Sequence, residues 1–174
     1  DPMPRDPRFD ALFQPLKIGP VTAPNRFWQV PHCTGMGNRH PQTLAQMRKV
    51  KAEGGWGVVN TEYCSIHESS DDTPAIHASL WDDHDIRAHA LMTAAVHDHG
   101  SLAGVELWHG GARASNAWSR MPGIAPLSVM AQNVPWQTQK MDRQDVAEFR
   151  AIHQAAALRA LAADFDVVYV YAAH

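Results

Sequence analysis

The sequence predicts an α/β fold built around a parallel sheet. Apolar segments typical of strands alternate along the chain with segments whose apolar residues recur at helical spacing. The strand-like segments are apolar throughout, which is typical of parallel strands covered on both faces. Four such units fit half of a (β/α)₈ barrel or a small doubly wound sheet. A complete barrel needs about 250 residues, whereas this chain has 174.

The chain opens with a predicted hairpin and a first strand. In residues 13–26, Leu, Ile and Val alternate with polar residues around a turn at Gly19-Pro20. Residues 27–30 are a short apolar run that ends at Pro31, which favours extended backbone in the residue before it. We therefore expect a strand whose C-terminal end opens into a loop.

Two helix–strand units follow. Residues 43–54 show a helical period that ends at Gly54-Gly55, and residues 56–63 form the second predicted strand. Residues 83–99 repeat apolar side chains at helical spacing up to Gly100 and lead into a third strand at 102–108.

A last unit completes the chain. A loop containing Pro and Gly covers about residues 110–140, and loops of this length tend to be functional. Asp142 is a predicted N-cap for a helix whose apolar stripe includes Val146, Phe149 and Ile152. Residues 166–171 form the fourth predicted strand.

Composition excludes several classes of protein. With 15 Lys+Arg against 18 Asp+Glu, the net charge of −3 offers no general attraction to nucleic acid or anionic lipid. No apolar run approaches the roughly 18 residues of a membrane span, and the N-terminus lacks the features of a secretory signal. Cys33 and Cys64 form no Cys-x-x-Cys pair, which disfavours a disulfide scaffold or structural zinc. We expect a cytoplasmic protein without a metal site in this chain.

Polar and reactive residues gather where each predicted strand ends. Parallel strands place their C-terminal ends on one face, and in a barrel that face carries the active site. The residues that share this position are Pro31, His32, Cys33, Tyr63, Glu106, Trp108, His109, Tyr171 and His174.

The residue types leave several roles open. Cys33 could be a nucleophile, a metal ligand or a covalent attachment point, or simply a small buried apolar side chain. Tyr63 and Trp108 could line an aromatic pocket for an organic cation or pack in the core. Tyr171 and His174 could form a phenol–imidazole pair for proton transfer.

Six blocks of the sequence resemble a known family. The first consists of residues 15–20 and 25–27, and the others are residues 30–33, 51–56, 60–65, 104–108 and 168–174. Together they are similar to the FMN-dependent amine dehydrogenases of the trimethylamine type, a branch of the Old Yellow Enzyme class of (β/α)₈ barrels. The resemblance implies that residues 1–174 supply the first four βα units and the N-terminal hairpin of an FMN-binding TIM barrel. The rest of that barrel and any C-terminal domains would lie outside this chain.

The resemblance also implies a role for each site residue. Cys33 would be bonded to carbon 6 of FMN, and Pro31, His32 and Glu106 would contact the flavin. Tyr63 would form one wall of the bowl that holds the amine. Tyr171 and His174 would be catalytic members of a Tyr-His-Asp triad.

The family reaction implied is oxidative N-demethylation of trimethylamine to dimethylamine and formaldehyde. Electrons would pass to a [4Fe-4S] cluster and then to an electron-transfer flavoprotein, in an enzyme expected to be a homodimer. No Cys follows Cys64, so the cluster ligands are not in this chain and we expect it to be inactive alone. Relatives acting on dimethylamine or histamine would carry Gln where this chain has Tyr63, so Tyr63 favours a tertiary amine. His109 stands where the resemblance predicts an aromatic ring, a departure that bears on substrate choice.

Two other functions are compatible with these residues. One is an ene-reductase of the Old Yellow Enzyme type that uses NAD(P)H, which Cys33 and Tyr63 disfavour. The other is a non-catalytic half-barrel that acts as a binding or assembly module. The flavin content would distinguish the three functions. An amine dehydrogenase would carry covalent flavin, an ene-reductase would carry exchangeable flavin, and a non-catalytic module would carry none.

Overall fold

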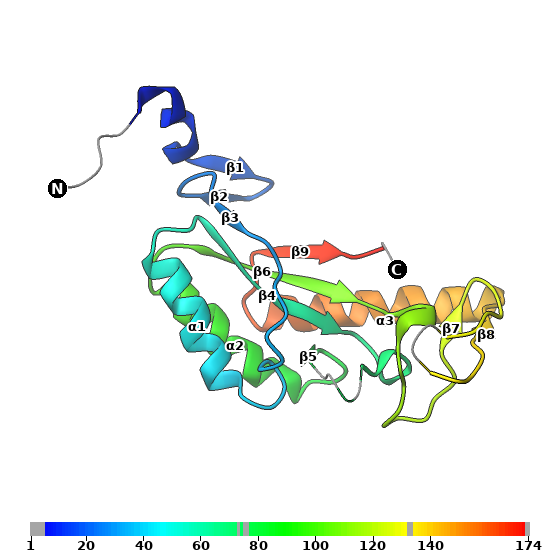
Figure 1. The fold of residues 1–174 in the computed structure, drawn as a ribbon. Helices are drawn as coiled ribbons and strands as arrows, with labels where there is room; N and C mark the ends of the chain where they lie inside the picture. Colours follow the sequence, from blue (N-terminus) through cyan, green and yellow to red (C-terminus); the bar gives the residue numbers. More distant parts are fainter. Residues whose placement is uncertain (1–5, 73, 75–76, 132–133, 173–174) are drawn as a thin grey trace.

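The computed structural model describes residues 6–72, 74, 77–131 and 134–172, which form a mixed α/β structure (Figure 1). A five-stranded sheet packs against three α-helices. The helices are α1 (Pro41–Glu53), α2 (Asp85–His97) and α3 (Arg143–Ala162), with short 3₁₀ helices η1 (Pro7–Phe13), η2 (Glu68–Ser70) and η3 (Gly111–Arg113). The strands are β1 (Leu16–Ile18), β2 (Val21–Ala23), β3 (Trp28–Gln29), β4 (Val58–Ser65), β5 (Ala78–Ser79), β6 (Leu102–Trp108), β7 (Ile124–Ala125), β8 (Gln139–Lys140) and β9 (Val167–Val170).

The main strands are parallel and lie in chain order. β3 pairs with β4, β4 with β6 and β6 with β9, and the two-residue β5 extends the sheet beside the end of β4. A doubly wound sheet reverses its strand order at a switch point, and this sheet does not reverse. The order is that of consecutive strands in a (β/α)₈ barrel, so the structure is about half of one.

All three helices pack against the same face of the sheet (Figure 1). Val59, Val105 and Leu107 of the sheet are fully buried there. Small side chains bring the helices close to them, and one core cluster contains Ala45 and Ala52 of α1, Met92 and Val96 of α2, and Ala156 and Ala160 of α3. Burial of each large apolar side chain contributes about 1.5–3 kcal/mol. The opposite face, which a complete barrel encloses, is the helix-free face.

The predicted elements are confirmed with small shifts at their ends. Asp142 is the N-cap of α3 and forms a capping box with Asp145, in which the carboxylate of each residue accepts a hydrogen bond from the backbone N–H of the other. At the end of α1, Gly55 adopts φ +92°, a conformation that favours glycine and stops the helix.

The N-terminal hairpin is also confirmed, as the antiparallel pair β1–β2. It lies at the N-terminal ends of the barrel strands, away from the ends that carry the polar residues (Figure 1). The Asn25 side chain donates to the carbonyl of Gly55 at 2.8 Å, and the ring of Phe27 packs edge-on against Trp56. The segment that follows the hairpin therefore packs against the turn before β4 and not against the candidate site.

The segment predicted as a loop at about 110–140 has structure of its own. It contains η3 and a parallel pair, β7 with β8, and an isolated bridge joins Met130 to Gln137. Strands of two residues are too short to leave a periodic pattern in a sequence.

Candidate active site

The ends of the parallel strands bring two predicted site residues, Tyr63 and Glu106, into one row. Tyr63 of β4 pairs with Glu106 of β6, and Glu106 pairs with Tyr169 of β9. Their neighbours Cys64 and Leu107 belong to the core on the helix side, so alternation turns Tyr63 and Glu106 to the helix-free face. Tyr171 follows two residues after Tyr169, and its N–H donates to the carbonyl of Leu107 at 3.2 Å.

A bulge in β4 re-aims one side chain out of this row. Asn60 pairs with Gly104, but the next aligned pair is Tyr63 with Glu106, so β4 has one residue more than β6 in this interval. Such an insertion bends the strand and changes the direction of its side chains. As a result the carboxylate of Glu62, which has no exposed side-chain surface, reaches the loop after β3.

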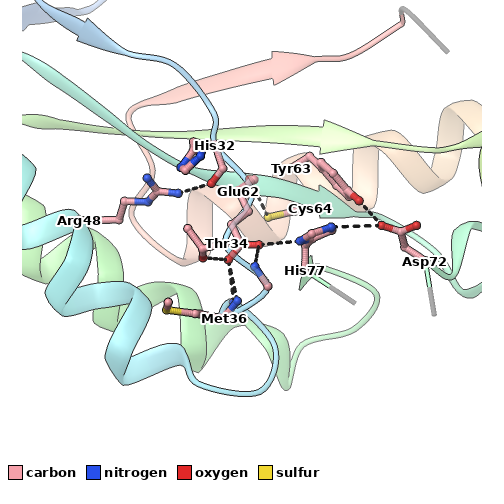
Figure 2. A network of polar contacts seen from close by, with 11 residues as sticks. His32, Thr34, Met36, Arg48, Glu62, Tyr63, Cys64, Asp72 and His77 are labelled. Atoms are coloured by element: carbon pink, nitrogen blue, oxygen red, sulfur yellow. Dashed lines mark hydrogen bonds and ion pairs between the residues drawn. The ribbon is translucent and has the colours of Figure 1, made fainter. Parts of the chain in front are cut away.

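Glu62 is the acceptor at the centre of this loop (Figure 2). Its oxygens accept from the Thr34 hydroxyl at 2.6 Å and from the backbone N–H groups of Gly35, Met36 and Gly37, each at 3.0 Å. Burial by itself would raise the pKa of Glu62, but these donors and His77 lower it to about 2. Glu62 is therefore ionised at neutral pH and fixes the loop that follows Cys33.

Arg48 of α1 holds the other side of the same loop. Its guanidinium is fully buried and donates to the carbonyl of His32, while the N–H of His32 donates to the carbonyl of Thr61 at 3.3 Å. Burial lowers the pKa of Arg48, and the charge of Glu62 opposes that shift. The segment Pro31–Cys33 is thus tied to both α1 and β4.

Cys33 is an exposed free cysteine beside the end of β4. Desolvation of the thiol raises its pKa to about 11, a backbone hydrogen bond from Tyr63 opposes the shift, and the carboxylates of Glu62, Glu106 and Asp72 add to it. In the absence of a bound group, Cys33 is therefore a thiol and not a thiolate at neutral pH.

This shift predicts slow alkylation of Cys33 at neutral pH. In the flavin-free protein, the rate with iodoacetamide should rise with pH and level off only at about pH 11, because the thiolate is the nucleophile. Mass spectrometry of the modified peptide gives the rate, and fully buried Cys64 serves as an internal control that stays unmodified. A rate that levels off near the ordinary cysteine pKa of about 8.5 would contradict the prediction.

Tyr63 lies in a cluster of rings and carboxylates. Its ring centroid is 4.7 Å from that of Trp108 and 4.6 Å from that of His77, and its hydroxyl donates to Asp72 (Figure 2). Burial, followed by the Asp72 carboxylate, raises the pKa of Tyr63, so the phenol stays protonated. The predicted aromatic pair of Tyr63 and Trp108 is therefore present in the structure.

Glu106 is a half-buried carboxyl on the helix-free face. Within the described part of the chain it has no hydrogen-bond partner, and burial raises its pKa. A buried carboxyl without a partner is costly. The position suits a ligand that offers a polar N–H group to it.

The remaining predicted residues divide into three cases. His174 lies outside the described residues. Tyr171 lines a cavity of about 490 Å³ next to His109, Phe149 and His153. His109 is buried, its Nε2 is 3.0 Å from the Ser69 hydroxyl, and burial lowers its pKa to about 4. His109 is thus a neutral packed ring that faces Phe149 rather than Tyr63.

Sequence reasoning assigned no role to four residues that organise the site, namely Arg48, Glu62, Asp72 and His77. Glu62 stands next to Tyr63, but the direction of its side chain depends on the bulge in β4. Asp72 and His77 lie in a loop without a recognisable spacing. Arg48 lies among other basic residues of α1, and only its complete burial distinguishes it.

Comparisons with known proteins place this geometry in context. Residues 11–174 match the model of the NADH:flavin oxidoreductase / NADH oxidase family. The dimethylamine dehydrogenase of Hyphomicrobium sp. (strain x) is 47% identical over 180 residues, an alignment that covers 99% of this chain and 24% of that protein. The chain therefore spans about a quarter of the length of this relative.

Two solved structures share the fold closely. The 6-hydroxypseudooxynicotine amine oxidase of Pseudomonas geniculata N1 is 46% identical with a TM-score of 0.93. The histamine dehydrogenase of Rhizobium sp. 4-9 is 42% identical with a TM-score of 0.94. Each match covers 98% of this chain and 26% of the other. Among the described residues, no helix is long and apolar enough to cross a membrane.

Proposed function

The chain belongs to the NADH:flavin oxidoreductase / NADH oxidase family, and from this premise we propose that it is part of a flavoenzyme that oxidises methylated amines. In this proposal residues 1–174 are the N-terminal half of an FMN-binding barrel domain, whose remainder and further domains lie outside the chain. The preferred substrate is trimethylamine, oxidised with water to dimethylamine and formaldehyde with release of two electrons and two protons. The arrangement of Tyr63 against Trp108 carries the proposal.

The residues at the strand ends fit a flavin. Pro31, His32 and Cys33 would border its ring system, and the Glu106 carboxyl would accept from a ring N–H, which supplies the partner that Glu106 lacks. The exposed thiol of Cys33 suits a covalent attachment. When bound, FMN accepts the two electrons that leave the amine.

Tyr63 and Trp108 would hold the substrate. An aromatic face attracts a methylated ammonium by about 0.5–2 kcal/mol and packs against the methyl groups of the neutral amine. The Tyr63 hydroxyl donates to Asp72, which leaves the ring as the surface that meets the amine. A neutral tertiary amine has no N–H, so it loses no hydrogen bond when it packs against this ring.

Tyr171 and His174 are proposed as the proton-handling pair. In this proposal the two side chains would pass a proton between the bound amine and the rest of the site. Burial and Asp72 raise the pKa of Tyr63, so Tyr63 does not serve as a base at neutral pH.

The electron path and assembly are proposed on the family resemblance. Electrons would pass through a [4Fe-4S] cluster held by other parts of the protein to an electron-transfer flavoprotein, and the enzyme would be a homodimer. Dimethylamine is the second candidate substrate, because a dimethylamine dehydrogenase is 47% identical to this chain.

The test is a steady-state assay of the intact protein with an artificial electron acceptor. Trimethylamine should have a higher kcat/KM than dimethylamine or histamine, and the variant Tyr63→Gln should lower kcat/KM for trimethylamine by a factor of roughly 2 to 30. A preference for histamine would contradict the proposal. Oxidation of NAD(P)H coupled to reduction of an activated alkene, without amine turnover, would favour an ene-reductase, and no flavin at all would favour a non-catalytic module.

A further inference from the structure

The hydroxyl of Tyr63 is held by a chain of three polar residues that the proposed reaction does not use. The chain runs from Glu62 through His77 and Asp72 to Tyr63 (Figure 2). It joins the loop after β3, the end of β4 and the segment before β5. Its terminal contact falls on the residue that would meet the substrate.

The first step concerns the hydroxyl itself. A phenol has one proton to donate, and Tyr63 donates it to the carboxylate of Asp72. The same ring is flanked by Trp108 at an interplanar angle of 37° and by the edge of His77 at 69°. Rotation of the ring is therefore restricted while Asp72 holds its polar end.

The second step concerns what holds Asp72. The Nε2 atom of His77 lies 3.6 Å from an Asp72 carboxylate oxygen, and its Nδ1 atom lies 3.1 Å from a Glu62 oxygen. Because Glu62 is fully buried and ionised, Nδ1 donates to it, which fixes the orientation of the His77 ring. The fixed His77 ring therefore lies beside both the Asp72 carboxylate and the Tyr63 ring.

The third step is chemical. Oxidation of an amine draws electrons from the nitrogen lone pair, and a free phenol O–H beside that nitrogen would donate a hydrogen bond to it. Such a bond stabilises the bound amine more than the transition state, since the lone pair is being lost there. If Tyr63 contacts the amine through its ring alone, the bound amine is not stabilised in this way.

We propose that Asp72 is a positioning residue that keeps the Tyr63 hydroxyl turned away from the amine nitrogen. The proposal rests on the proposed function for the identity of the substrate. In this proposal Asp72 does not contact the substrate and affects its oxidation only by orienting the Tyr63 hydroxyl.

The experiment is a double-mutant cycle in the holoenzyme. Asp72→Ala, Tyr63→Phe and the double variant are assayed with whichever amine the wild type oxidises best. Asp72→Ala should lower kcat roughly tenfold and lower KM with it, because the freed hydroxyl stabilises bound substrate. In the Tyr63→Phe background the same change should have no effect. Asp72→Asn keeps an acceptor and should restore kcat, and Asp98→Ala, an exposed Asp at the end of α2, is the matched control.

The outcomes separate the two proposals. Loss of kcat on Asp72→Ala that persists in the Tyr63→Phe background would overturn the inference, since Asp72 would then act without the hydroxyl. A raised KM with an unchanged kcat in Asp72→Ala would also overturn the inference. If no amine is oxidised, the proposed function fails. The hydrogen bond between Tyr63 and Asp72 is then tested separately, by measuring the ionisation of Tyr63 through the absorbance of its phenolate. Asp72→Ala should lower the pKa of Tyr63, and an unchanged pKa would overturn the inference.

Discussion

Replacing Glu62 with glutamine is expected to destabilise the protein by about 3–5 kcal/mol, the usual cost of breaking a buried charged network. Four donors of the loop at residues 34–37 and the Nδ1 atom of His77 converge on this carboxylate. An amide can accept through one atom only and presents its own N–H groups to the other donors. The loop should therefore open locally before the sheet does.

Hydrogen exchange and denaturant unfolding of the intact protein measure this effect. The amides of Gly35, Met36 and Gly37 should exchange much faster in Glu62→Gln, whereas those of the core strands should keep their order of protection. Glu53→Gln, an exposed carboxylate at the end of α1, is the matched control and should change neither quantity. Unchanged protection of the loop in Glu62→Gln would show that Glu62 does not hold it.

The same residue makes stability depend on pH. The pKa of Glu62 is about 2 in the folded protein, compared with an ordinary value of 4.5. Because the folded pKa is lower, the stabilisation is complete above about pH 4.5 and is lost as the pH falls towards 2. Glu62→Gln should remove this part of the acid sensitivity.

Replacing Cys33 with alanine is expected to abolish covalent flavin altogether. Cys64, the other cysteine of this chain, is fully buried on the helix side of β4 and cannot substitute for it. In the wild type, colour should remain with acid-precipitated protein, and the intact mass should include one FMN. In Cys33→Ala the flavin should appear in the supernatant.

A second measurement separates attachment from binding. Cys33→Ala should still bind FMN reversibly, because the other proposed flavin contacts, Pro31, His32 and Glu106, remain. Its flavin content before precipitation should therefore be close to that of the wild type. Flavin that stays in the precipitate of Cys33→Ala would place the attachment at another residue. If purified Cys33→Ala contains no flavin even before precipitation, the thiol is needed for flavin binding itself.

The sequence predicted the sheet and helices well because their signals are local. β6 was predicted with the residue bounds that the structure shows, and the Asp142 cap is a short-range hydrogen bond that residue type alone indicates. Parallel pairing then brings the ends of β4 and β6 together, and the bulge in β4 sets the register that places Tyr63 opposite Glu106. By contrast, the two-residue strands β5, β7 and β8 depend on contacts made elsewhere in the fold.

The network around Tyr63 could not be predicted in the same way. Glu62 is 28 positions from Thr34, and its direction depends on a bulge that no residue type in β4 announces. Asp72 and His77 reach Tyr63 and Glu62 from an irregular segment. The burial of Arg48 likewise follows from how α1 packs and not from its apolar period.

The dependence of the Cys33 loop on Glu62 also sets an order of events during maturation. Residues 34–37 acquire their acceptor only when β4 is in the sheet beside β6, which requires contacts between distant parts of the chain. A nascent or misfolded chain lacks the raised thiol pKa that the folded surroundings impose on Cys33. The thiol should therefore react faster with electrophiles and oxidants before folding than in the folded protein.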